Sequence, residues 1–132
     1  MTNIGVSQQN RAQSQAAGSV IDRAGALARV DGDGELMASL VDIFFTESAP
    51  MMEAIRTAVT SGDPVKLEKT AHRLKGSVSI FCAEAATQTA FELEKIGRGG
   101  NLTNATETFA RLQQQMARLQ TALKQFRSEL QS

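Results

Sequence analysis

The chain has 132 residues, 42% of them hydrophobic, which is enough for the core of one domain. Its 14 acidic and 14 basic residues cancel, so net charge gives no argument for binding to nucleic acid or to an anionic membrane. A single cysteine and a single histidine exclude an internal disulfide and a zinc site of the cysteine and histidine kind. No apolar run reaches the roughly 20 residues that span a bilayer. The chain also opens without the apolar segment of a secretory signal, so we expect a cytoplasmic protein.

The composition changes near residue 18. Residues 1–18 are rich in Gln, Ser, Asn, Ala and Gly and carry few large apolar side chains, so burial cannot offset the entropy lost on ordering them. From Ser19 onward, apolar residues recur at spacings of three and four, which is typical of amphipathic helices. We therefore predict a disordered tail or linker over residues 1–18 and one all-α domain over residues 19–130.

Glycine, proline and capping residues divide this domain into helices. The first is short, over residues 19–30, and ends at the Asp-Gly-Asp-Gly turn of residues 31–34. A longer helix follows over residues 35–49. Pro50 then marks a break or the first turn of a new helix, which Gly62 ends.

The next predicted helix contains the only histidine. Asp63 is a good N-cap and Pro64 a good first helical residue, so this helix is expected to begin there. It is predicted to run through His72 to about Phe81.

Two further helices complete the domain. One begins at residue 84 and is expected to stop at the glycine-rich turn of residues 97–100. The other follows Asn104, which together with Glu107 resembles a capping box. Short connections favour antiparallel neighbours, so we predict an antiparallel four-helix bundle with a short additional N-terminal helix. The last helix would seal the bundle with Phe109, Leu112, Met116, Leu119, Leu123 and Phe126.

Helical geometry places His72 away from the core. At 100° per residue, one stripe of its helix carries Leu67, Ala71, Leu74, Val78 and Phe81. The side chain of His72 points about 140° away from the centre of this stripe, and Gly76 lies about 180° away. The imidazole is therefore expected to face solvent. An incidental surface histidine is the simplest interpretation of a single exposed imidazole.

The neighbours of His72 favour a functional role. A glycine inside a helix costs about 1 kcal/mol relative to alanine, and Gly76, one turn after His72, leaves one flank of the ring uncovered. Lys69 and Lys75 bring positive charge within one turn, and Ser79 shares the face of the histidine. An exposed ring nitrogen flanked by ammonium groups is suited to accept a phosphoryl group.

These residues also form a family pattern. The segment AHRLKGSVSIFCA (residues 71–83), followed by AFELEKIGRGG (residues 90–100), closely resembles the histidine phosphotransfer (HPt) domains of bacterial multistep phosphorelays. Their usual pattern is A-H-x-L-K-G-S, then a small or glycine position before Ala, and later Leu-Glu near a glycine turn. The resemblance extends over about residues 19–127.

The resemblance implies a phosphocarrier rather than an enzyme with its own catalytic centre. His72 would accept a phosphoryl group from the aspartyl phosphate of a receiver domain and pass it to the aspartate of another receiver. Lys75 would be the cation near the phosphoryl group, and Gly76 would leave room for the active site of the receiver. Lys69 and Ser79 would be auxiliary positions.

The same resemblance defines the expected partners and cofactors. The partners would be response-regulator receiver domains, and a hybrid sensor histidine kinase could be a partner or the parent protein. The magnesium ion of the reaction is held by the receiver, so no cofactor or metal is expected on this chain. A polar exterior and small size favour a monomer, without nucleic acid or membrane insertion.

Two positions depart from the commonest family pattern. Cys82 stands where many members have glycine, and Ile80 stands where a polar residue is frequent. We interpret Cys82 as a small buried hydrophobic residue, because free cysteine is often buried. We assign neither position to phosphoryl chemistry, so the departures put local packing and partner preference in doubt.

Two other functions are alternatives to a phosphocarrier. One is a helical-bundle docking module, a degenerate HPt domain that binds a receiver or kinase without accepting phosphate. Loss of the histidine or the lysine would indicate such a module, and both residues are present. The other, a stand-alone histidine kinase, lacks a second domain for ATP and a phosphate-binding loop.

Overall fold

The computed structural model describes residues 20–131, so the predicted tail over residues 1–18 lies outside the described part. The all-α prediction is confirmed, because this part contains helices and no strand. The helices are α2 (Arg23–Arg29), α3 (Gly34–Ser61), α4 (Pro64–Ser79), α5 (Glu84–Gly99) and α6 (Ala105–Leu130).

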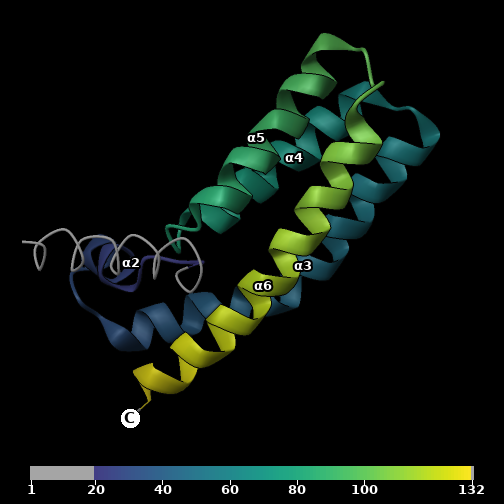
Figure 1. Ribbon diagram of the computed structural model, residues 1–132. Coiled ribbons are helices and arrows are strands. Elements are labelled where there is room, and N and C mark those ends of the chain that lie inside the picture. Colours follow the sequence, from purple (N-terminus) through teal and green to yellow (C-terminus); the bar gives the residue numbers. More distant parts are fainter. Residues whose placement is uncertain (1–19, 132) are drawn as a thin grey trace, which may run out of the picture.

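The four longer helices form the predicted antiparallel bundle. Each of them packs against two neighbours, in the order α3, α4, α5, α6 and back to α3. Figure 1 shows them running alternately up and down, with α3 and α6 extending beyond α4 and α5. The short helix α2 lies at the end where α4 stops and α5 begins. Two hydrogen bonds fasten it there: Asp22 N–H donates to the Phe81 carbonyl at 3.4 Å, and the Arg29 guanidinium donates to the Ser79 carbonyl at 2.8 Å.

The predicted apolar stripes form the core. All five stripe residues of the histidine-containing segment are fully buried: Leu67, Ala71, Leu74, Val78 and Phe81. The six residues expected on the last helix are buried as well: Phe109, Leu112, Met116, Leu119, Leu123 and Phe126. Burying one such large apolar side chain contributes about 1.5–3 kcal/mol, so these stripes hold the bundle together.

The predicted junction between α3 and α4 is confirmed. Gly62 follows α3 in the left-handed conformation, with φ of 68°, which glycine adopts without strain. Asp63 caps α4 through its side chain, which accepts a hydrogen bond from Lys66 N–H at 3.1 Å, and Pro64 is the first helical residue. The helix ends at Ser79, two residues before the predicted end at Phe81.

The prediction of a break at Pro50 was wrong, because α3 continues through this residue. Proline removes the hydrogen bond that residue 50 would donate to the Thr46 carbonyl. Thr46 and Pro50 are both exposed, so water can bond to that carbonyl. Phe44 on one side and Met51 and Ile55 on the other are buried, and their packing keeps the helix continuous.

The predicted glycine turn at residues 97–100 was also placed too early. Helix α5 runs through Gly97 and ends at Gly99, and Gly100 follows it in the left-handed conformation with φ of 83°. Gly97 is buried against α4, so its role is close helix packing.

The capping box predicted at the start of α6 is absent. Asn104 is the N-cap residue, but its side chain makes no capping hydrogen bond, and its φ of −96° and ψ of 7° are not the extended values usual for such a cap. The Thr108 hydroxyl instead donates to the Asn104 carbonyl at 2.9 Å.

Candidate functional site

The side chain of His72 lies on the solvent face of α4, as helical geometry predicts. It is 64% exposed, while the stripe on the opposite side of the helix is buried. An incoming group can therefore reach the imidazole without any rearrangement of the core.

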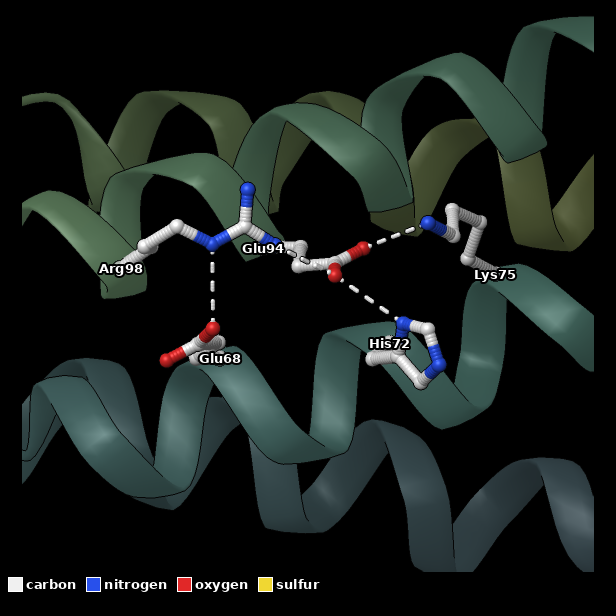
Figure 2. A network of polar contacts seen from close by, with 5 residues as sticks. All are labelled: Glu68, His72, Lys75, Glu94 and Arg98. Atoms are coloured by element: carbon white, nitrogen blue, oxygen red, sulfur yellow. Dashed lines mark hydrogen bonds and ion pairs between the residues drawn. The ribbon is translucent and has the colours of Figure 1, made fainter.

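A buried carboxylate on α5 fixes one side of this ring. Nδ1 of His72 lies 3.0 Å from Oε2 of Glu94, whose side chain is only 5% exposed. An ionised carboxylate can only accept hydrogen bonds, so the neutral imidazole donates through Nδ1–H. The lone pair is then on Nε2, which points away from Glu94 in Figure 2.

Lys75 lies on the other oxygen of the same carboxylate. Its Nζ is 2.7 Å from Oε1 of Glu94, which makes a close ion pair. The ammonium also lies 4.7 Å from the centroid of the Phe91 ring, which favours a cation there. Contacts with Glu94 and Phe91 on α5 thus hold the ammonium of Lys75 at this site.

Arg98 completes a network of five charged or polar side chains. One guanidinium nitrogen, Nη2, donates to Oε2 of Glu94 at 2.8 Å, and Nε donates to Oε2 of Glu68 at 3.1 Å. Glu68 is on α4 and Glu94 on α5, so Arg98 ties the two helices together beside the histidine, as Figure 2 shows.

The electrostatics keep Glu94 ionised. Burial raises the pKa of its carboxyl group, but Lys75 and His72 lower it by hydrogen bonding and by charge, and the net pKa lies below the ordinary value. Glu94 therefore carries its negative charge at neutral pH and remains an acceptor for Nδ1 of His72.

Gly97 explains how this carboxylate reaches the histidine. A Cβ atom at this position would lie 2.5 Å from the backbone nitrogen of Glu68 and 2.7 Å from the carbonyl oxygen of Pro64. Only glycine lets the backbones of α4 and α5 approach so closely. The approach brings the α5 side chains Glu94 and Arg98 within hydrogen-bonding distance of α4.

The remaining predicted residues lie outside the network. A Cβ atom at Gly76 would meet nothing within 4 Å, so this position is open surface. Lys69 is exposed and has no ion-pair partner within residues 20–131. The Ser79 hydroxyl donates to the Gly76 carbonyl at 2.8 Å, so it bonds to the end of its own helix rather than to His72.

Glu94 and Arg98 are site residues that were not predicted from the sequence. Their spacing of four residues on one helix, with opposite charges, is a signal for an ion pair. The Leu-Glu element of the family pattern also contains Glu94. Neither signal says which residue of another helix they contact.

The prediction that Cys82 is buried was wrong, because its side chain is half-buried. The backbone at Cys82 has φ of 53°, in the left-handed region that favours glycine. This conformation accounts for the glycine that many similar domains have here. Within residues 20–131 no cluster of three or more His, Cys, Asp and Glu side chains could hold a metal ion.

Comparison with known proteins identifies the family of the chain. Residues 39–122, more than half of the chain, match the family model described as the Hpt domain. The chain belongs to the Hpt family. This part extends from α3 into α6 and contains every residue of the network around His72. Members of the Hpt family act as phosphocarriers in phosphorelays, so the chain has a phosphotransfer role.

A solved Hpt structure has the same fold. The crystal structure of histidine-containing phosphotransfer protein B (HptB) from Pseudomonas aeruginosa PAO1 matches with a TM-score of 0.76 and 25% sequence identity. The match covers 83% of this chain and 95% of that one. A search of curated proteins found no match. Within residues 20–131, no helix is both long enough and apolar enough to cross a membrane.

Proposed function

We propose that this Hpt chain is a phosphorelay intermediate in which His72 carries the phosphoryl group. The group comes from the aspartyl phosphate of one receiver domain and passes to the aspartate of another. The observation that carries the proposal is an exposed imidazole whose Nδ1 faces a buried, ionised carboxylate. This arrangement leaves Nε2 as an outward-facing nucleophile.

The transfer step follows from this tautomer. The Nε2 lone pair attacks phosphorus, the Nε2–P bond forms, and the bond between phosphorus and the aspartyl oxygen breaks, releasing the carboxylate of the receiver. Nδ1 keeps its proton throughout, so the ring gains positive charge as the bond forms. Glu94 accepts from Nδ1 and stabilises that charge, and positioning with electrostatic stabilisation supplies most of the rate. The reverse step loads the second receiver.

We assign to the neighbouring residues the roles that the family resemblance implies. Lys75 supplies a cation to the phosphoryl group and lies in reach because Glu94 and Phe91 hold its ammonium at the site. Gly76 keeps the approach open, since no atom lies where its side chain would be. Lys69 adds positive charge to the same face, and the Ser79 hydroxyl bonds to the carbonyl at Gly76.

The proposal also includes the setting of the reaction. The chain acts as a phosphocarrier without a catalytic centre of its own, and the magnesium ion belongs to the receiver. The receivers are separate proteins or parts of a hybrid sensor histidine kinase. The chain works as a cytoplasmic monomer.

A transfer assay with labelled, phosphorylated receivers or a hybrid kinase tests the proposal. Wild-type protein is expected to take up a label that is acid-labile and alkali-stable, and His72→Gln is expected to take up none. Labelling of His72→Gln would exclude His72 as the acceptor. Failure of the wild type across a broad panel of receivers would favour the docking module instead.

The chain offers a matched pair of lysines for the same assay. Nζ of Lys75 and Nζ of Lys95 lie 4.7 and 4.6 Å from the Phe91 centroid, but only Lys75 pairs with Glu94. Lys75→Gln is expected to slow transfer about tenfold to a hundredfold, as for loss of one hydrogen bond to a charged group. Lys95→Gln should leave the rate within about twofold, because rim charges contribute little. Equal rates for the two variants would remove Lys75 from the mechanism.

A further inference from the structure

The two oxygens of Glu94 have different partners. Oε1 contacts Lys75 at 2.7 Å, whereas Oε2 is shared by Nδ1 of His72 at 3.0 Å and by Arg98 at 2.8 Å. The oxygen that selects the tautomer of the histidine is therefore the one that Arg98 holds. Arg98 itself is fixed at a second point by Glu68.

Lys75 cannot stabilise Glu94 and the phosphoryl group equally at the same time. When its ammonium turns toward an incoming phosphoryl group, Oε1 loses a close cation. A carboxylate that is almost fully buried is costly to leave without compensation. Arg98 is placed to remain on Oε2 during such an exchange, because its guanidinium is anchored by carboxylates on both α4 and α5.

We propose that Arg98, anchored by Glu68, is a positioning residue that holds Oε2 of Glu94 on Nδ1 of His72. The role rests on the phosphotransfer function proposed above. By holding the acceptor in place, Arg98 keeps the proton on Nδ1 and the lone pair on Nε2, also while Lys75 engages the phosphoryl group. Arg98 acts through Glu94, since its guanidinium donates to the carboxylates of Glu94 and Glu68.

Arginine suits this task better than lysine would. Its planar guanidinium presents several N–H donors in a fixed fork, so it can bond to two carboxylates at once. Nε and Nη2 of Arg98 are used in this way, for Glu68 and Glu94 respectively. A lysine could keep the charge but would not fix the orientation of Glu94 through two rigid contacts.

The tautomer can be measured directly, because His72 is the only histidine in the chain. Nitrogen-15 NMR of the neutral imidazole in unphosphorylated protein distinguishes Nδ1–H from Nε2–H. The wild type is expected to show mainly Nδ1–H. Arg98→Gln should raise the Nε2–H share and slow transfer about threefold to tenfold, the range for one net hydrogen bond. Arg98→Lys should give an Nε2–H share and a transfer rate between those of the wild type and Arg98→Gln. Glu68→Gln should change the share and the rate in the same direction as Arg98→Gln, but by less.

The chain provides a matched control in Arg111, which pairs with Glu92 between α6 and α5 at 3.0 Å. Its side chain is 48% exposed, compared with 55% for Arg98. Arg111→Gln should change neither the tautomer ratio nor the rate.

Three results would overturn the positioning role. One is an unchanged tautomer ratio in Arg98→Gln, whatever its transfer rate. Another is a changed ratio with an unchanged rate. The third is the same change in Arg111→Gln. The NMR measurement needs no phosphate donor, so this failure is distinguishable from failure of the proposed function, which appears as wild-type protein that takes up no label.

Discussion

Two glycines near the histidine, one on α4 and one on α5, have opposite surroundings. A Cβ atom at Gly97 would collide with the backbone of α4, whereas a Cβ atom at Gly76 would meet no atom within 4 Å. Gly97 thus makes room inside the molecule, where two helices must touch to assemble the network around His72. Gly76 leaves open surface outside it, on the side where the proposed receiver would approach. Internal packing therefore explains one glycine, and the proposed access of a receiver explains the other.

The largest expected effect on stability is at the internal position. Gly97→Ala gains helix propensity, but its Cβ would lie 2.5 Å from the backbone nitrogen of Glu68, so α4 and α5 must move apart. Overpacking of this kind costs about 1–3 kcal/mol, and we expect the free energy of unfolding to fall by about that amount. Urea unfolding of the variant and the wild type measures the change.

Gly99 provides the control for this substitution. It lies in the same last turn of α5, but a Cβ atom there would meet nothing within 4 Å. Gly99→Ala should be neutral or stabilising by up to about 1 kcal/mol. If Gly97→Ala proved as stable as Gly99→Ala, the close approach would not be what Gly97 provides.

The contacts of Glu94 between α4 and α5 also predict that the stability of the fold depends on pH. The pKa of Glu94 is lower in the folded protein than its ordinary value of 4.5, because Lys75 and His72 outweigh the effect of burial. The unfolded chain therefore binds a proton more readily as the pH falls, and this favours unfolding. The contribution of Glu94 to stability should be complete above about pH 4.5 and should be lost as the pH falls through the lower folded pKa.

Glu94→Gln isolates this contribution. At pH 7 we expect the variant to be less stable than the wild type by about 1–2 kcal/mol, the scale of a hydrogen bond to a charged group. The difference should shrink as the pH is lowered below 4.5, because Glu94 then becomes neutral in the wild type too. Denaturant unfolding over a pH series measures it, and a difference that grows toward acid pH would contradict the lowered pKa.

The fold could be predicted where a local pattern and the packing agree. The apolar stripes along α4 and α6 are buried as expected, because spacing of three and four residues places them on one side of a helix. At Pro50 and Gly97, the expectation that proline or glycine ends a helix was wrong. The helix continues at both positions because of contacts with other helices, which residues far away in the sequence supply.

The site shows the same limit. The exposure of His72 follows from its angle on α4, and the family pattern also assigns roles to Lys75 and Gly76. The contact with Glu94 joins residues 22 apart on different helices, and it depends on how α5 sits along α4. That register is set by the close approach at Gly97, which the sequence analysis took for a turn. The residues that control the imidazole were therefore missed although the imidazole was found.

The smallest effect on stability is expected at the open glycine, and it separates access from packing. Gly76→Ala should raise the free energy of unfolding by about 0.5–1 kcal/mol, since the added methyl group meets nothing and alanine favours the helix. Gly76→Gln should fold equally well but slow phosphoryl transfer by about tenfold or more, because its longer side chain stands one turn from His72, where the receiver must approach. Unfolding curves and transfer rates of both variants decide the matter. Rapid transfer by Gly76→Gln would show that the receiver does not use this surface, while a loss of stability in Gly76→Ala would mean that the position is packed after all.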